Sequence, residues 1–177
     1  MAMSNWLKKQ GVNGFVDLCI MLIATIVAAM MMQPHLIFSN SIPTGGDYGG
    51  HLEVPHYLLN HLIPNGQIFG WSPDWYNGWP INIFYFPLPA LIISLLSVII
   101  PYVVAFKLVV AIGPILLPFA IWLVGRSSKL PHPMSSMMAV AMVSYLINQS
   151  YQIDGGNIFS TMAGEYSFSI SLLFSLF

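Results

Sequence analysis

"YVVAFKLVVAIGPILLPFAIWLVG", residues 102–125, is the stretch that decides the fold. Lys107 is the only charged side chain in it, and the stretch is longer than the roughly 20 apolar residues that a membrane-spanning helix needs. It therefore predicts a helix that crosses the hydrocarbon core of a membrane.

The composition of the whole chain points the same way. The 177 residues are 56% hydrophobic and 6% charged, with a mean hydropathy of +0.74. Soluble globular domains carry about 25% charged residues. The composition predicts an integral membrane protein, and the five Lys and Arg side chains form no basic patch for nucleic acid.

A second apolar run, residues 15–38, follows Lys8 and Lys9. It predicts the first membrane-spanning helix. A cleavable signal peptide is the alternative, because residues 39–41 (Ser-Asn-Ser) are small, but the apolar core exceeds the usual 7 to 15 residues.

The apolar run at residues 88–100 decides the topology. It has only about 13 residues before Pro101, which is short of a span. If it does not cross, the basic residues that flank the two long runs all lie on one side, as the positive-inside rule prefers. These basic residues are Lys8, Lys9, Arg126 and Lys129. We therefore expect the N-terminus to be cytoplasmic, residues 39–87 to be outside, and residues 88–100 to lie at the outer interface.

Two later stretches predict further spans, residues 134–149 and a helix that begins near Tyr166 and is cut off at Phe177. The expected fold is all-α, a polytopic transmembrane helix bundle with juxtamembrane helices in a long first outer loop. Residues 1–177 form a single domain, expected to be the N-terminal part of a larger membrane domain. In this topology five acids lie outside, namely Asp47, Glu53, Asp74, Asp154 and Glu165.

The first candidate site is "GGDYGGHLE", residues 45–53. Its glycines allow close approach of a ligand to the main chain. Asp47 is expected to serve as a general base or metal ligand, with His51 as a helper or second ligand for a divalent metal ion. The alternative is that Asp47 caps the helix that follows. A metal site with the later histidines is a weak prediction, because Pro55 is expected to interrupt the helix between them.

The second candidate site is "DGGNIFSTMAGEYSFS", residues 154–169. Here too, acids stand beside glycines at the outer end of a span. Charged side chains at membrane depth tend to mark functional sites, so Asp154 and especially Glu165 are candidates, with a solvated loop acid as the alternative.

Two further features bear on ligand binding. The run at residues 69–87 is rich in aromatic residues, typical either of a belt at the membrane interface or of the walls of a ligand site. Trp75, Trp79 and Tyr85 are the candidates for such walls. Lys107, near the outer end of its span, either snorkels to the headgroups or contacts an anionic group such as a lipid phosphate.

The combination of these stretches, with "GWSPDWYNGWPINIFYFPLPALI" and the basic turn "GRSSKL", resembles the N-terminal half of the GT-C superfamily of membrane glycosyltransferases. The group most similar is the set of prokaryotic membrane proteins labelled "6-pyruvoyl-tetrahydropterin-synthase-related", with the mycobacterial arabinofuranosyltransferases as more distant relatives. GT-C proteins have more spans than this sequence, commonly seven or more.

The resemblance implies transfer of a sugar from a polyprenyl-phosphate carrier to a glycan, lipid or protein acceptor at the outer face of the membrane. The membrane expected is the prokaryotic cytoplasmic membrane. By resemblance, Asp47 is the general base or assists a metal, Glu165 or less securely Asp154 is the second acid, and Lys107 faces the carrier phosphate. The alternative is a non-catalytic membrane subunit, or a module that binds the lipid carrier, on the same scaffold. A small transporter is less favoured because the acids lie at the ends of spans.

Overall fold

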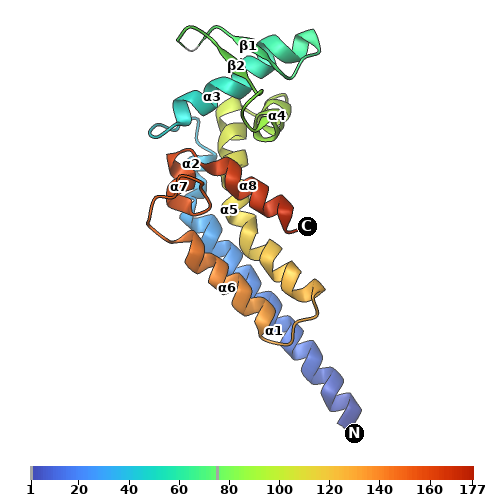
Figure 1. Cartoon of the computed structure of the whole chain (residues 1–177). Coiled ribbons are helices and arrows are strands. Elements are labelled where there is room, and N and C mark those ends of the chain that lie inside the picture. The colour runs from blue at the N-terminus through green and yellow to red at the C-terminus, as the bar shows by residue number, and fades with distance from the viewer. Residues whose placement is uncertain (1, 75) are drawn as a thin grey trace.

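The protein is described by a computed structural model that covers residues 2–74 and 76–177, with side chains from residue 11 onward. Three helices form the long part of the molecule: α1 (Ala2–Met31), α5 (Tyr102–Ser127) and α6 (Met134–Leu146). Each packs against the other two, and together they extend away from the rest of the chain (Figure 1).

Two helices are long and apolar enough to cross a membrane, Gly11–Met31 within α1 and Tyr102–Ser127. Only 22% of the apolar window in α1 is buried inside the molecule. Large apolar side chains such as Phe15, Ile23 and Met30 are instead exposed. A core helix of a soluble protein would bury such a face, so these exposed side chains favour contact with lipid.

Two predicted spans differ from the structure. The first was expected to continue to residue 38, but α1 ends at Met31, Gln33 adopts a left-handed conformation (φ 52°), and a short helix, α2 (Pro34–Ile37), follows. Pro34 explains the break, because the residue before a proline is disfavoured in the α region. The span expected at 134–149 is the shorter α6, whose 13 residues are fewer than a membrane span needs.

Of the last two helices, one was not predicted and the other begins where the sequence predicted it. Asn157 caps α7 (Ile158–Ala163) by accepting a hydrogen bond from the Ser160 amide, and α8 (Tyr166–Ser175) has only ten residues. The two helices α8 and α5 cross closely at Gly113, where an added Cβ would lie 2.8 Å from the Cβ of Ser169. In the described part of the chain, α8 begins at Tyr166, as predicted, and packs on α5.

Residues 48–96 are more varied in structure than the all-α prediction. Helix α3 (Tyr48–Tyr57) continues through a π-helical turn, η1 (Leu58–Leu62), and a 3₁₀ turn, η2 (Ile63–Asn65). Pro55 lies inside this helix and does not interrupt it, contrary to the prediction. A hairpin of β1 (Gly70–Ser72) and β2 (Trp79–Ile81) follows, and α4 (Pro87–Leu96) leads into α5.

The hairpin was not predicted. Its strands are antiparallel, with Gly70 opposite Ile81 and Ser72 opposite Trp79. Aromatic residues favour strands as much as they favour a membrane interface, so the composition alone did not separate the two. The described fold is mostly helical and contains one small two-stranded sheet.

A buried core joins residues 48–96 to the bundle. Phe106 of α5 is fully buried and contacts the rings of Tyr48 and Tyr166 edge to face, at 5.7 and 5.8 Å between centroids. Ile93 of α4 and Ile170 of α8 complete this cluster. This cluster packs α3, α4, α5 and α8 against one another.

The opposite end of the bundle holds a second polar cluster. Asp17 of α1 is 1% exposed. One carboxylate oxygen accepts hydrogen bonds from Ser136 Oγ at 2.7 Å and, with the appropriate tautomer, from His132 Nδ1 at 2.9 Å. Arg126 lies 4.0 Å from the other oxygen. Asp17 therefore links α1 to both ends of the α5–α6 connection.

Candidate functional site

The two predicted acidic stretches meet in space. The Asp47 amide donates a hydrogen bond to the Ala163 carbonyl at 2.9 Å. An added Cβ at Gly164 would lie 3.0 Å from the Asp47 Cβ, and one at Gly46 would lie 1.9 Å from the Ala163 oxygen. Glycines at both positions let the two turns touch, which brings Asp47 at the start of α3 beside Glu165 at the start of α8.

Neither acid serves as a helix cap through its side chain. Asp47 and Glu165 occupy the N-cap positions of α3 and α8, but neither makes a side-chain capping hydrogen bond. The capping interpretation of Asp47 is therefore not supported by the structure. Its exposed carboxylate remains available to a ligand.

The electrostatics of the pair differ from those of isolated surface acids. Burial raises the pKa of Glu165, and the negative charges of Asp47 and, more weakly, Asp154 raise it further. A hydrogen bond from Tyr151 opposes these effects. Glu165 therefore keeps its proton to a higher pH than an isolated glutamate does.

His51 stands one helical turn after Asp47 and is 8% exposed. Its ring lies between those of Tyr85 and Tyr166, at 5.4 and 5.2 Å between centroids. Its Nε2 is 3.5 Å from the Tyr85 hydroxyl. Burial lowers the pKa of His51, and the charge of Asp47 opposes this, so the imidazole is held neutral and can either donate or accept a hydrogen bond.

A cavity of about 260 Å³ opens beside these groups. Its walls are formed by Asp47, Gly50, His51, Val54, Trp79 and Tyr85. Burial, with the charges of Glu165 and Asp47, raises the pKa of Tyr85 to about 12, so its hydroxyl keeps its proton. The cavity combines a carboxylate, an imidazole and a phenol with two flat aromatic surfaces.

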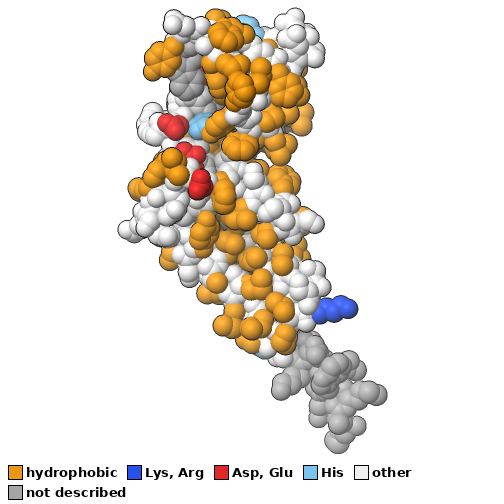
Figure 2. All heavy atoms as spheres, in the orientation of Figure 1, with side chains coloured by type: hydrophobic (Ala, Val, Ile, Leu, Met, Phe, Trp, Pro, Cys, Tyr) orange, Lys and Arg blue, Asp and Glu red, His pale blue; other side chains and the backbone are white. Residues whose placement is uncertain are grey.

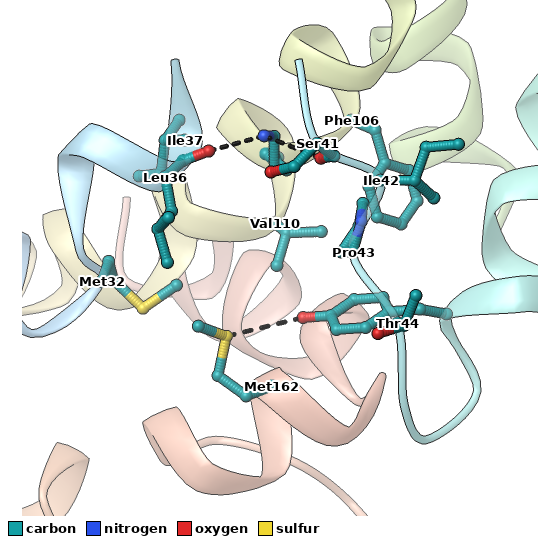
Figure 3. Close-up of a pocket in the computed structure, with 12 residues that line it drawn as sticks. Met32, Leu36, Ile37, Ser41, Ile42, Pro43, Thr44, Phe106, Val110 and Met162 are labelled. Atoms are coloured by element: carbon teal, nitrogen blue, oxygen red, sulfur yellow. Dashed lines mark hydrogen bonds between the residues drawn. The ribbon is translucent and has the colours of Figure 1, made fainter. Parts of the chain in front are cut away.

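Lys107 lines a different cavity, of about 350 Å³, whose walls are mostly apolar. Figure 3 shows Met32 and Met162 on one side of it and Pro43 and Thr44 on the other. Tyr48, the neighbour of Asp47, belongs to this second cavity. The Lys107 ammonium group donates hydrogen bonds to main-chain carbonyls beside the cavity. The sequence had predicted that it extends to the lipid headgroups or contacts an anionic group.

The remaining predicted residues are distributed as follows. Asp154 is exposed in the loop between α6 and α7, where its charge acts on Glu165. Trp75 lies outside the described residues. Among the described residues, no three His, Cys, Asp or Glu side chains gather to hold a metal ion, so Asp47 and His51 would need ligands from elsewhere.

Tyrosines are the functional candidates that sequence reasoning missed. Tyr151 bonds to Glu165, and Tyr166 packs on His51. Tyr166 directly follows Glu165 in the sequence, which is a signal that could have been used. Tyr151 carries no such signal, because its contact depends on how the loop after α6 folds back.

On the face drawn in Figure 2, acidic and basic side chains lie at different levels. Figure 2 shows the acidic side chains of this face together at the level of α3 and α7, and the basic side chain of this face near the opposite end of the bundle.

Comparison of the chain with known protein families, curated proteins and solved structures finds no match.

Proposed function

We propose that this chain is an integral membrane protein that carries a sugar-transfer site at its outer end, as the resemblance to GT-C glycosyltransferases implies. The proposal depends on one observation above all. Asp47 and Glu165, from stretches far apart in the sequence, come together beside a cavity with aromatic walls. A pair of carboxylates, here with the pKa of Glu165 raised, is a recurring arrangement for acid and base catalysis.

In this proposal Asp47 is the general base. Its carboxylate would take the proton from an acceptor hydroxyl as that oxygen attacks the anomeric carbon of the donor sugar. The bond from that carbon to the carrier phosphate breaks, and the phosphate leaves with the bonding electrons. Glu165, with its raised pKa, would hold or return a proton near the same place.

The cavity beside Asp47 fits one sugar ring. Trp79 and Tyr85 offer flat apolar surfaces, while Asp47 and His51 offer partners for hydroxyl groups. The second cavity, with Lys107 on its wall, is mostly apolar and fits the lipid end of a carrier. Asp47 and Tyr48 are consecutive residues, so the two cavities meet at the start of α3.

If a divalent metal ion takes part, Asp47 and His51 are the residues that would hold it, through a carboxylate oxygen and an imidazole nitrogen. Such an ion would stabilise the charge that develops on the leaving phosphate. The other ligands would come from the substrate or from water.

A transfer assay tests the catalytic proposal. The purified chain in lipid nanodiscs is incubated with a panel of polyprenyl-phosphate-linked sugars, and product is measured by mass spectrometry. Asp47→Asn and Glu165→Gln should each lower the rate by about 10² to 10⁴, because they remove a general base or acid. Asp74→Asn is the matched control, since Asp74 is an exposed acid near the hairpin and outside both cavities.

The second candidate is a module that binds a lipid carrier and does not turn it over. It is favoured by the large apolar cavity beside Lys107. It predicts that native mass spectrometry detects bound polyprenyl phosphate while the transfer assay gives no product for the unaltered chain. Transfer that is lost in Asp47→Asn would exclude it.

A further inference from the structure

The segment that leads to Asp47 has few attachments of its own. Residues 38–46, which we call the strap, join α2 to α3 and are largely exposed. Within this described segment, no amide from residue 40 to 46 donates a hydrogen bond to another main-chain group. The strap is therefore fixed mainly by contacts that other parts of the chain make with it.

Lys107 supplies such a contact from α5. Its Nζ donates to the carbonyls of Leu36 and Ser39, each at 2.5 Å, and to the Ser41 carbonyl at 3.1 Å. The Ser39 hydroxyl lies 3.1 Å from the same nitrogen. In Figure 3, dashed lines reach Leu36 and Ser41 on the edge of the cavity.

Neutral carbonyl and hydroxyl groups surround the positive charge of Lys107. Among the described residues, both ion pairs involve Asp17, at the other end of the bundle. The ammonium group is thus surrounded by carbonyl and hydroxyl oxygens of one short segment, without a paired carboxylate. An ammonium group can donate three hydrogen bonds, and these contacts use that capacity.

The far end of the strap leads directly into Asp47. Its amide is bonded to Ala163, in the turn before Glu165. Lys107 at the near end and Ala163 at the far end therefore hold the strap between them. A chain fixed at both ends has fewer conformations than one fixed at a single end.

We propose that Lys107 is a positioning residue that holds the strap against α5 and thereby keeps the Asp47 carboxylate beside Glu165. This goes beyond facing a carrier phosphate. The positional part is independent of sugar transfer, whereas its relevance to a reaction rests on the proposed function. Loss of the ammonium group leaves carbonyls in an exposed segment, where water can replace it, so the bundle should stay folded while the strap loosens.

The first test measures the mobility of the strap. A spin label is attached at Asn40→Cys in the full chain with Cys19→Ser, in lipid nanodiscs. We expect the electron paramagnetic resonance spectrum to show slow motion of the label when Lys107 is present and fast motion in Lys107→Met. Slow motion should return in Lys107→Arg, because a guanidinium can also donate to carbonyls. Lys129→Met is the matched control, at the opposite end of α5.

The second test measures the position of Asp47. Cysteines at Asp47 and Glu165, again with Cys19→Ser, are joined by a short bifunctional maleimide. The yield should fall several-fold in Lys107→Met and stay high in Lys107→Arg and Lys129→Met. An unchanged yield and a label that stays slow in Lys107→Met would overturn the inference, as would equal loosening by Lys129→Met. Neither readout requires activity, so failure of the transfer proposal would be seen separately.

Discussion

Gly46 and Ala163 touch through their main chains, so closely that a Cβ on Gly46 would lie 1.9 Å from the Ala163 carbonyl oxygen. Gly46 also has a left-handed conformation, with φ of 51°. These two facts make Gly46 the residue on which the meeting of the two acidic stretches depends.

Gly46→Ala should therefore separate the two turns. We expect a loss of more than about 1 kcal/mol in the free energy of unfolding, because the clash is with the main chain and the conformation is unfavourable for alanine. Thermal unfolding of the purified protein measures it. Gly49→Ala is the matched control, since a Cβ there meets nothing within 4 Å inside α3, and it should be neutral or stabilising. Equal effects of the two variants would contradict the prediction.

Glu165 should make stability depend on pH. Its folded pKa is raised above the ordinary value of 4.5, so its contribution to stability is present below pH 4.5 and is lost as the pH rises through the folded pKa. Glu165→Gln removes the ionisation. The variant should have a higher Tm than the unaltered protein at pH 7, and the two values should converge below about pH 4.5. A difference in Tm that is the same at both pH values would refute this explanation.

Asp17 should be important for the stability of the bundle. Asp17→Ala removes the acceptor shared by His132 and Ser136, in a buried place. We expect destabilisation of about 1–3 kcal/mol, since His132 and Ser136 lose their shared carboxylate acceptor, although Ser136 keeps its hydrogen bond to the Pro133 carbonyl. Ser127→Ala, which removes an exposed hydroxyl at the end of α5, is the control. Unfolding of both variants in detergent measures the change in the free energy of unfolding. An equal change in Asp17→Ala and Ser127→Ala would contradict the prediction.

The orientation in the membrane can be mapped with single cysteines in a Cys19→Ser background. Cysteines at Asn40 and Ser150 should react with a membrane-impermeant maleimide added to intact cells. A cysteine at Ser128, beside Arg126, should react only after the membrane is opened, because the positive-inside rule puts this turn in the cytoplasm. Labelling of Ser128 in intact cells would reverse the topology.

The sequence predicted the parts of this molecule that follow from local composition. The lengths of the apolar runs indicated both long helices. The glycines beside Asp47 were predicted to let a ligand approach the main chain, whereas in the structure Gly46 makes room for the Ala163 carbonyl. The hairpin was missed because aromatic residues suit strands and interfaces equally well. The end of α1 was misplaced because hydropathy does not register the conformational effect of Pro34.

The surroundings of Lys107 were beyond sequence reasoning for a different reason. Its acceptors are main-chain carbonyls, which every residue has, and only the path of the chain after α2 brings them to α5. The same holds for Tyr151 and Glu165, which are brought together by the loop after α6. Such contacts depend on tertiary structure and leave no pattern in the residue types.

The first turn of α3 is a partition between two chambers. Asp47 faces the chamber with aromatic walls, and Tyr48 faces the apolar one while its hydroxyl bonds to the Thr161 carbonyl at 2.8 Å. A displacement of this single turn would enlarge one chamber at the expense of the other. A ligand that moves this turn from one side would therefore change the space available on the other.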